Sequence, residues 1–285
     1  MAETWTVRSL LAWAREWLTN KGVDSPRLDA ELLLAHALGC SRTRLYVDFD
    51  KPLSPEELAR VKPLLQRRAQ REPVAYILGV REFYGRPFRV GPGVFIPRPE
   101  TELLVQAAVE ALPSQARVLD LCAGSGAVGV SIAAELPGAR VDLVEASPEA
   151  AAAARENADK LAPGRARVYE GDLFAALAER TRYDGVVANP PYVAEGERDR
   201  LSAEIVVHEP PHALFAAEGG LAVIRRIVAE AGSWLVSGAF LGIEIDAALS
   251  GSVRDLCTQA GFTNVRVVKD LAGLDRHVLG RAPEP

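Results

Sequence analysis

The chain has 285 residues, of which 48% are hydrophobic and 25% are charged, and its net charge at pH 7 is −5. This length leaves room for about two domains with buried cores. No uncharged apolar run approaches the roughly 18 residues of a membrane-spanning helix, so we expect no contact with a membrane. The negative charge argues against a protein that holds duplex DNA, because such proteins gain most of their affinity from cations placed against phosphates.

The N-terminus and the cysteines bear on the cellular compartment. Residues 1–5 have no basic patch ahead of an apolar stretch, so we expect no signal peptide. Cys40, Cys122 and Cys257 are far apart in the sequence and lack the spacing of metal ligands. Isolated cysteines fit the reducing cytosol, and we interpret all three as small buried apolar residues. We therefore expect a cytoplasmic protein without a bound metal.

Residues 1–75 have the pattern of a small helical domain. A third helix is expected to begin at Ser54, because Ser54 to Glu57 has the sequence of a capping box with proline in the first turn. Pro63 falls inside this helix and should kink or split it. Earlier apolar residues recur at helical spacing and are expected to form the core: Leu10, Leu11, Ala14, Trp17 and Leu18, then Leu28, Leu32, Leu33, Ala35 and Leu38.

The densest basic stretch of the chain is residues 60–71, with Arg67, Arg68 and Arg71 close together on one helix. We expect a solvated helix face here, and docking to an acidic protein partner is the alternative. The domain contains no motif for a cofactor, so we expect it to recognise a substrate.

Residues 76–97, rich in Gly, Pro, Arg and aromatic residues, are expected to connect this domain to a second one formed by residues 98–285. The connector should contain a β-hairpin with strands at residues 81–84 and 87–90 and a turn at Gly85-Arg86. Beyond it, a helix is expected over residues 101–112. Arg98 is expected to pair with Glu100 or with an acidic group of a substrate, and an ordinary surface ion pair explains it equally well.

Strands and helices alternate through the second domain, which predicts a mostly parallel sheet. Its first strand, residues 117–122, breaks into a glycine-containing bend before a helix over residues 127–136. Such a bend lets the backbone approach a ligand closely, and the helix N-terminus behind it carries unpaired N–H groups. As in a Rossmann fold, the bend is a candidate cofactor site. Its residues are Cys122, Ala123, Gly124, Ser125 and Gly126.

Three further strands each end in a polar residue. Residues 140–144 lead to Glu145, whose carboxylate is suited to hold the two hydroxyl groups of a ribose. Residues 166–170 lead to Gly171-Asp172-Leu173, where Asp172 could accept a hydrogen bond from an adenine amine. Residues 183–188 lead to Asn189. Any one of these residues is common at a strand end, but four successive strand ends of this kind indicate one cofactor site.

Asn189-Pro190-Pro191-Tyr192 is the most informative motif in the sequence. The prolines fix φ and have no N–H, so the carbonyl groups of this turn are held rigid and are available as acceptors. The Asn189 side chain adds an acceptor and Tyr192 adds a flat ring. This set predicts a clamp for a planar –NH₂ group, either the exocyclic amine of a base or a carboxamide. We assign Asn189, Pro190 and Tyr192 to catalysis and all four residues to substrate binding.

The rest of the chain should complete the sheet. Residues 195–214 follow the clamp and are expected to form a loop over it. His208 and His212 in this loop are better explained by packing than by a role as general base. Helices are expected over residues 221–234 and 252–259, and strands over residues 239–245, 264–268 and 277–279.

The four strand-end motifs resemble those of the class I S-adenosylmethionine-dependent methyltransferases of the N6-adenine and N5-glutamine branch. Residues 79–85 (GVREFYG) and 94–101 (VFIPRPET) narrow the resemblance. Together with Asn-Pro-Pro-Tyr they are similar to the bacterial HemK/PrmC peptide chain release factor glutamine methyltransferases, over essentially the whole chain. One departure is Cys122, where many relatives have glycine.

The resemblance implies an α/β, Rossmann-like methyltransferase fold with a mostly parallel seven-stranded sheet whose last strand is antiparallel, plus the N-terminal helical domain joined by the hairpin. It implies S-adenosylmethionine as the cofactor. The methyl acceptor would be the glutamine amide in the Gly-Gly-Gln loop of peptide chain release factors. We expect these protein partners, no direct contact with nucleic acid, and a monomer.

Other functions remain open at this point. An N6-adenine methyltransferase acting on nucleic acid would use the same clamp on a flipped base, but should carry a basic recognition domain. A glutamine methyltransferase acting on a ribosomal protein is a second alternative. A non-catalytic binding module is a third, against which the complete set of motif residues argues.

Overall fold

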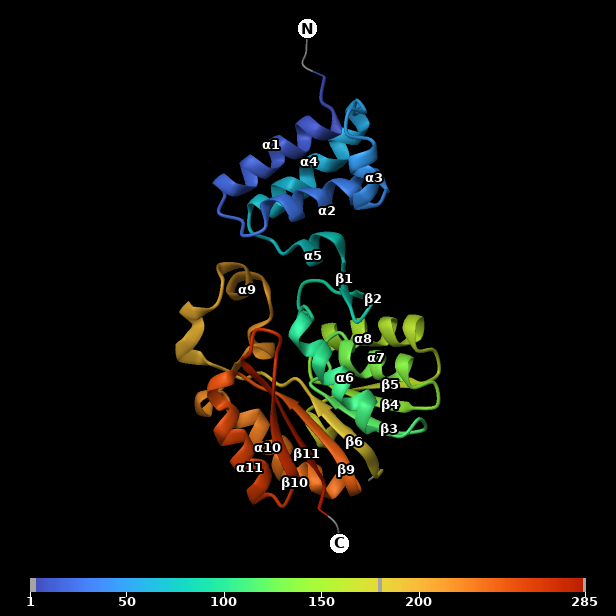
Figure 1. The fold of residues 1–285 in the computed structure, drawn as a ribbon, viewed down its shortest axis with the longest axis vertical. Coiled ribbons are helices and arrows are strands. Elements are labelled where there is room, and N and C mark those ends of the chain that lie inside the picture. Colours follow the sequence, from blue (N-terminus) through green and yellow to red (C-terminus); the bar gives the residue numbers. More distant parts are fainter. Residues whose placement is uncertain (1–3, 179–180, 284–285) are drawn as a thin grey trace. The chain divides into compact units, whose positions relative to one another are not determined.

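The computed structural model describes residues 4–178 and 181–283, and the chain divides into two compact units (Figure 1). The first unit comprises the chain as far as Val80 together with Ala203–His208. The second comprises Arg81–Ser202 and the chain from Glu209 onward. Each unit has a hydrophobic core of its own.

The first unit is helical. Its capping box forms as predicted, since Ser54 Oγ accepts from the Glu57 N–H and the Glu57 carboxylate accepts from the Ser54 N–H. The helix that begins there continues through Pro63, so the expected split is wrong; Val61 and Leu65 on either side pack into the core and compensate for the missing hydrogen bond. The helices are α1 (Val7–Asn20), α2 (Pro26–Leu38), α3 (Arg42–Val47), α4 (Pro55–Ala69) and α5 (Val74–Leu78).

The basic stretch of α4 is not a solvated face. The Arg68 side chain is only 4% exposed and lies between two carboxylates, with Nε 2.7 Å from Asp29 Oδ2 and Nη2 2.8 Å from Glu204 Oε1. Arg71 also pairs with Glu204, at 3.0 Å. Glu204 belongs to α9 (Ala203–His208), so these ion pairs hold the inserted segment within the first unit. The expectation of a solvated face fails for Arg68, because Asp29 and Glu204, which are far from it in the sequence, supply the carboxylates that pair with it.

The second unit is built on a seven-stranded sheet with the order β10-β11-β9-β6-β3-β4-β5. β11 runs antiparallel to both of its neighbours, and the other six strands are parallel, as expected. The strand order reverses between β3 and β6, which is the position where ligands bind in sheets of this type. The strands are β3 (Arg117–Leu121), β4 (Arg140–Glu145), β5 (Ala166–Glu170), β6 (Tyr183–Ala188), β9 (Leu235–Glu244), β10 (Thr263–Lys269) and β11 (Asp275–Arg281).

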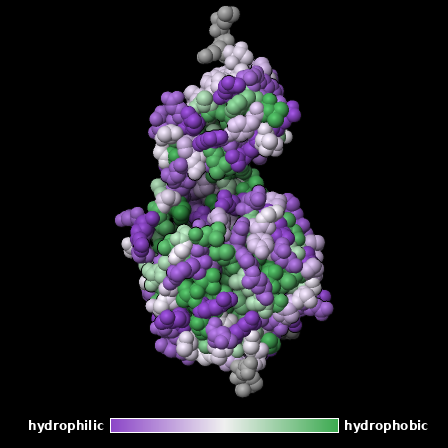
Figure 2. All heavy atoms as spheres, viewed as in Figure 1, coloured by the Kyte–Doolittle hydropathy of each residue, from purple (hydrophilic) through white to green (hydrophobic). Residues whose placement is uncertain are grey.

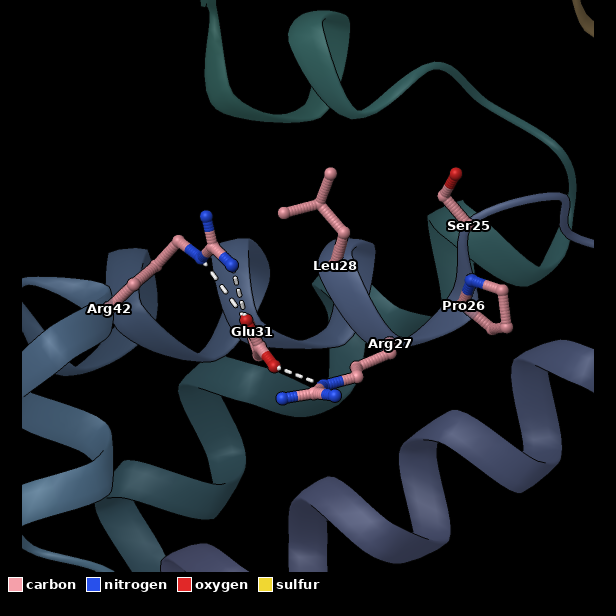
Figure 3. Close-up of a pocket in the computed structure, with 6 residues that line it drawn as sticks. All are labelled: Ser25, Pro26, Arg27, Leu28, Glu31 and Arg42. Carbon is pink, nitrogen blue, oxygen red and sulfur yellow. Dashed lines mark hydrogen bonds and ion pairs between the residues drawn. The ribbon is translucent and has the colours of Figure 1, made fainter.

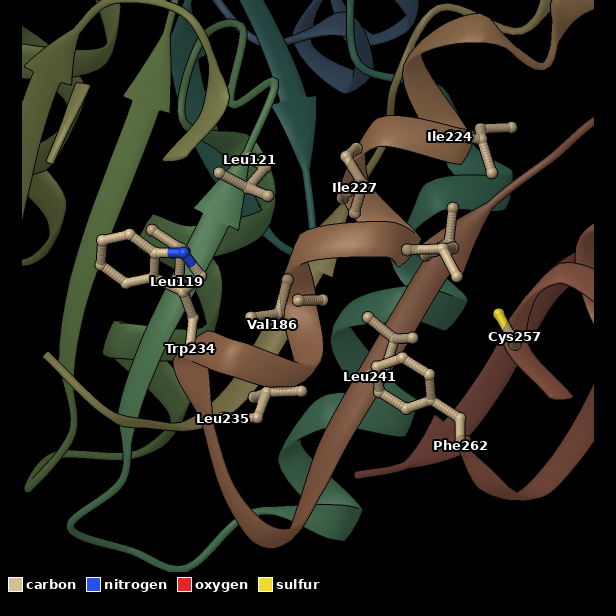
Figure 4. Packing of buried hydrophobic residues seen from close by; sticks show 14 of the residues in the cluster. Leu119, Leu121, Val186, Ile224, Ile227, Trp234, Leu235, Leu241, Cys257 and Phe262 are labelled. Atoms are coloured by element: carbon tan, nitrogen blue, oxygen red, sulfur yellow. The ribbon is translucent and has the colours of Figure 1, made fainter. Parts of the chain in front are cut away.

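Helices cover both faces of this sheet (Figure 1). One face carries α6 (Glu102–Ala111), α7 (Ala127–Glu135) and α8 (Pro148–Leu161), and the other carries α10 (Ala222–Trp234) and α11 (Ser250–Gln259). Figure 4 shows the core beneath α10, where Ile224, Ile227 and Trp234 pack among side chains of the strands. The inner strands β3, β4 and β6 are largely buried, which explains their nearly continuous apolar sequences, whereas the edge strands β5 and β10 are more exposed.

The β-hairpin consists of β1 (Val80–Phe83) and β2 (Arg86–Arg89). Its turn is at Tyr84-Gly85, one residue earlier than predicted, and both residues have positive φ, +50° and +69°. Two residues of this kind are typical of a type I′ turn, whose twist matches that of the strands. Phe83 and Phe88 are buried edge to face within the core of the second unit, so the hairpin is part of that core as well as a connector.

Side chains of different character are mixed on the surface that Figure 2 displays, where hydrophilic residues alternate with smaller apolar areas. Among the residues that the structure describes, no helix combines the length and the apolar character needed to cross a bilayer.

Candidate active site

The bend after β3 has the backbone that the sequence suggested. Cys122, Gly124 and Gly126 all adopt left-handed conformations, with φ of +57°, +57° and +80°. This explains why glycine is suited to position 122, where the cysteine side chain adds about 1 kcal/mol of strain. Burial raises the pKa of the Cys122 thiol well above its usual range, so this cysteine is a poor nucleophile.

The two glycines of the bend serve different purposes. A Cβ added to Gly126 would lie 3.1 Å from Leu143 Cδ2, so this glycine permits close packing of α7 against β4. A Cβ added to Gly124 would meet nothing within 4 Å, so Gly124 faces open space where a ligand could approach the backbone. Ser125 Oγ is buried there without a hydrogen-bond partner among the described residues. The bend therefore fits a bound cofactor.

Glu145, the last residue of β4, is joined to the bend. Its Oε2 accepts from the Gly124 N–H at 2.7 Å, and its Oε1 accepts from the Ser147 N–H at 2.8 Å. These two bonds fix the carboxylate while each oxygen retains a further lone pair. Ala123 adds a third tie to β4, since its N–H donates to the Val144 carbonyl at 3.1 Å. The residues present are thus suited to accept from a pair of ribose hydroxyls.

Asp172 and Leu173 differ in solvent exposure and in which of their atoms could contact a cofactor. The Asp172 carboxylate is exposed and pairs with Arg226 of α10 at 2.7 Å, so it would have to exchange this partner for an adenine amine. The Leu173 side chain is buried in the hydrophobic core, so only its backbone could face a cofactor. Both assignments stay predictions.

The clamp begins directly after β6. The Asn189 amide Nδ2 donates to Thr101 Oγ1 at 3.3 Å, and Thr101 is 2% exposed at the end of the 3₁₀-helix η1 (Pro99–Thr101). This bond engages the amide nitrogen, so Oδ1 is the atom of Asn189 that is oriented to accept from a ligand. Thr101 was not recognised as a site residue, although it closes the Ile-Pro-Arg-Pro-Glu-Thr motif. Pro190 is buried, and Pro191 is half-buried.

Tyr192 is held by its hydroxyl group, which donates to Glu244 Oε1 at 3.2 Å. Burial raises the pKa of the Tyr192 phenol well above its usual range, so it remains a neutral hydrogen-bond donor. Glu244 is the last residue of β9 and was not anticipated. The signal that identified Glu145, a carboxylate at the end of an apolar strand, was hidden for Glu244 because the predicted strand ran on to residue 245, whereas β9 ends at Glu244.

Residues 195–214 are more ordered in secondary structure than the predicted loop. They contain the short helices η3 (Glu195–Arg200), α9 and η4 (Pro211–Ala213), and the flanking strands β7 (Val193–Ala194) and β8 (Phe215–Ala216) pair with each other. Arg98 pairs with Glu209, not with Glu100, and Glu209 also accepts from the Ile96 N–H at 3.2 Å. The preference for Glu209 follows from its burial beside the Ile-Pro-Arg motif.

Solved structures identify the class of the fold. The chain resembles a methyltransferase from Pyrococcus furiosus (TM-score 0.55, 16% identity, covering 80% of this chain and all of that one). It also resembles the Thermus thermophilus 16S rRNA N2 G1207 methyltransferase solved with AdoMet and guanosine (TM-score 0.54, 24% identity, 72% of this chain and 50% of that one). The fold is that of the S-adenosylmethionine-dependent methyltransferases.

Sequence comparisons are more specific. Residues 9–79 match the model of the PrmC N-terminal domain, and residues 88–273 match that of the methyltransferase small domain. The release factor glutamine methyltransferase of Geobacter sulfurreducens is 43% identical over 98% of both chains. That of Burkholderia pseudomallei is 44% identical over 98% of this chain and 99% of its own. The chain belongs to the release factor glutamine methyltransferase family.

Proposed function

We propose that this protein transfers the methyl group of S-adenosylmethionine to the side-chain amide nitrogen of the glutamine in the Gly-Gly-Gln motif of peptide chain release factors. The observation that supports the proposal is the hydrogen bond from Asn189 Nδ2 to Thr101, which engages the amide nitrogen and leaves Oδ1 as the acceptor for a substrate N–H. The names of the relatives, over nearly their full lengths, support the same acceptor.

An amide nitrogen is a poor nucleophile, because its lone pair is delocalised into the carbonyl group. Asn189 Oδ1 and the Pro190 carbonyl would accept one N–H bond each, which favours a pyramidal nitrogen with its lone pair directed to the methyl group. Orientation of this kind contributes several kcal/mol, on the order of 7 in the best cases. S-adenosylmethionine supplies an activated methyl group bound to a sulfonium.

The remaining steps need little from acid–base chemistry. After the transfer the nitrogen is cationic and strongly acidic, so its proton leaves readily, and we assign no general base. The ring of Tyr192 would stabilise the developing positive charge through its face. For the cofactor we assign Glu145 to the ribose, Asp172 to the adenine amine, and the bend from Cys122 to Gly126, with the Leu173 backbone, to the remaining contacts.

The helical unit is our candidate for recognition of the release factor. It contains a cavity of about 380 Å³ around Glu31, which is 3% exposed (Figure 3). Arg27 and Arg42 both reach the Glu31 carboxylate, at 2.9 and 2.5 Å, and extend outward from it. Leu28 beside them is 41% exposed. Both arginines are paired with Glu31 but their side chains stay 71% and 48% exposed, so together with Leu28 they present a mixed polar and apolar surface to a partner protein.

Nucleic acid is the less favoured acceptor. The main basic stretch of the first unit is engaged internally, since Arg68 and Arg71 pair with Glu204, and Arg67 pairs with Glu72 at 2.5 Å. Cations used in this way are not available to neutralise phosphates.

The proposal is tested with Asn189→Ala and Asn189→Asp. We expect the alanine variant to lose orders of magnitude in kcat for a purified release factor and to bind S-adenosylmethionine with nearly unchanged affinity, because a contact made in the transition state appears in kcat. The aspartate variant keeps an acceptor oxygen and should retain far more activity. Radiolabel transfer measures the first quantity and calorimetry the second.

Parallel incubations with ribosomal proteins and with DNA identify the acceptor. Label on either of these but not on a release factor would overturn the proposed substrate. Full activity of both Asn189 variants would show that the turn is not the clamp.

A further inference from the structure

A group of buried polar side chains beneath the clamp has no part in the chemistry described above. Glu244 at the end of β9 is completely buried, and His277 on β11 is 1% exposed. The two residues are direct partners in the register of these antiparallel strands, and His277 Nε2 lies 3.5 Å from Glu244 Oε2. Glu244 Oε1 accepts the hydrogen bond from the Tyr192 hydroxyl. The three side chains thus form one chain of polar groups that ends at the clamp.

The burial of these polar groups is unfavourable for the stability of the fold. Among the residues that the structure describes, Glu244 Oε2 and both ring nitrogens of His277 are buried without a hydrogen-bond partner. A buried polar atom without a partner loses its hydrogen bonds to water and gains none in exchange. Ile243 and Val278, the adjacent register pair, are buried and apolar, so the polar pair interrupts an otherwise apolar stretch of these two strands. A cost of this kind in a native core calls for an explanation beyond packing.

The position of Glu244 beside the clamp offers an explanation for this buried polar side chain. Ala188 pairs with Ile243 in the parallel ladder between β6 and β9, so the next residues, Asn189 and Glu244, leave the sheet at the same level. Tyr192 is held at two points. A Cβ added to Gly220 would lie 2.1 Å from the Tyr192 carbonyl oxygen, so the backbone is packed tightly against this glycine, and the far end of the ring is held by Glu244. Together these contacts fix the direction of the ring.

We propose that Glu244 is a positioning residue for methyl transfer and that it acts by holding the Tyr192 hydroxyl. This inference rests on the proposed function of the clamp. The ring face can lie against the substrate amide only while the phenol is tethered. A small misplacement of a group that orients the substrate is costly, on the order of 100-fold in rate for 1 Å.

The chain contains a matched control for this contact. Tyr183 at the start of β6 is 1% exposed, and its hydroxyl donates to Asp142 Oδ2 at 2.8 Å. This pair joins the same kinds of group in the same sheet. It lies at the opposite end of the strand from the clamp, so Tyr183→Phe removes an equivalent hydrogen bond away from the site.

The test is a double-mutant cycle with the full-length enzyme, a purified release factor and S-adenosylmethionine. Tyr192→Phe and Glu244→Leu should each lower kcat about tenfold and leave the KM for S-adenosylmethionine unchanged, since each breaks the one hydrogen bond that holds the Tyr192 ring in place. The double variant should be no slower than either single variant, because both remove the same contact. Glu244→Gln, which keeps an acceptor oxygen, should recover most of the rate.

Several results would overturn the inference. One is a double variant about a hundredfold slower than the wild type, which is the product of independent effects. Another is a Gln variant as slow as the Leu variant, and a third is an undiminished kcat for Glu244→Leu.

The control variant Tyr183→Phe should retain the wild-type kcat. A loss equal to that of Tyr192→Phe would attribute the effect to a general weakening of the fold. If Glu244→Leu does not fold, the cycle of Tyr192→Phe with Glu244→Gln decides, since the Gln variant should be active only with the tyrosine hydroxyl present. A wild-type enzyme that fails to label any release factor would instead refute the proposed function.

Discussion

Asp120 lies near the end of β3. Its carboxyl group is almost completely buried and accepts a hydrogen bond from the Gly129 N–H at 2.8 Å. Burial raises the pKa of Asp120 to about 7. In the unfolded chain the group ionises near its ordinary value of 3.8. Between these two values the folded protein binds a proton that the unfolded chain has lost, so the contribution of Asp120 to stability falls as the pH rises and levels off above 7.

This predicts a pH-dependent effect of Asp120→Asn. The variant cannot ionise, so its free energy of unfolding should rise relative to the wild type as the pH goes from 4 to 8, by roughly 2 to 4 kcal/mol. Denaturant unfolding of both proteins at several pH values measures the difference. A constant difference across this range would show that Asp120 has the same pKa in the folded and unfolded states.

Glu145 allows a test of the cofactor assignment. Glu145→Ala removes the acceptor for the Gly124 and Ser147 N–H groups and for the ribose, so S-adenosylmethionine should bind more weakly by about 1 to 3 kcal/mol. Glu170 is the matched control. It pairs with Glu145 in the register of β4 and β5 and ends the adjacent strand, but is exposed. Calorimetry should give an unchanged affinity for Glu170→Ala, and an unchanged affinity for Glu145→Ala would refute the assignment.

At single positions, the sequence predicted a site residue where a local backbone conformation, such as a bend or a turn, needs a particular type of residue. Gly124 and Asn189 could be identified because a bend and a proline turn have local signatures. Thr101 could not be assigned as the partner of Asn189, nor Glu244 as the partner of Tyr192, because those contacts join residues 88 and 52 positions apart in the chain. The predicted strand over residues 239–245 placed Glu244 inside it, and the end of β9 and its register against β6 are needed to bring Glu244 beside the clamp.

At the scale of single elements, α9 was the least predictable from sequence. It is six residues long and lies in a stretch rich in charge and proline, so no periodic pattern marks it. Its place in the first unit depends on Arg68, whose partners Asp29 and Glu204 are 39 and 136 residues away. A run of basic residues on a helix is solvent-exposed only when no carboxylate from elsewhere in the chain forms ion pairs with it.

Arg68→Met should therefore be strongly destabilising. It leaves the Asp29 and Glu204 carboxylates near each other without their shared cation, and breaking a buried ion pair in this way costs about 3 to 5 kcal/mol. Arg8→Ala is the comparison, since Arg8 pairs with Asp50 on the surface, where the side chains are 61% and 81% exposed. We expect a loss within about 1 kcal/mol for that variant. Equal free energies of unfolding for the two variants would contradict the role given to Arg68.

For the whole molecule, the alternation of strands and helices was enough to predict a parallel sheet, and the family resemblance supplied the antiparallel strand. Strand order was not accessible from alternation alone, since pairing is decided by packing between segments distant in sequence. The hairpin was found at nearly its correct position because its turn is coded locally, although Tyr84 in a left-handed conformation shifted it by one residue.

Removal of residues 1–80 tests the division of labour between the units. The second unit retains all seven strands of its sheet and both of its core clusters, so S-adenosylmethionine should bind with nearly full affinity. Methylation of an intact release factor should fall by at least about tenfold in kcat/KM, equivalent to roughly 1.4 kcal/mol of lost docking energy. Equal kcat/KM for the two proteins would show that the helical unit does not recognise the substrate.

The place of β11 has a consequence for biosynthesis. It follows every other strand in the chain, yet lies inside the sheet between β9 and β10. A nascent chain that has emerged from the ribosome only as far as β10 would present two unpaired strand edges, which invite association with other chains. It would also lack His277 behind Glu244. A chain that ends before residue 281 would therefore leave β9 without its partner β11 and would be prone to aggregate, even with every motif residue from Cys122 to Tyr192 already made.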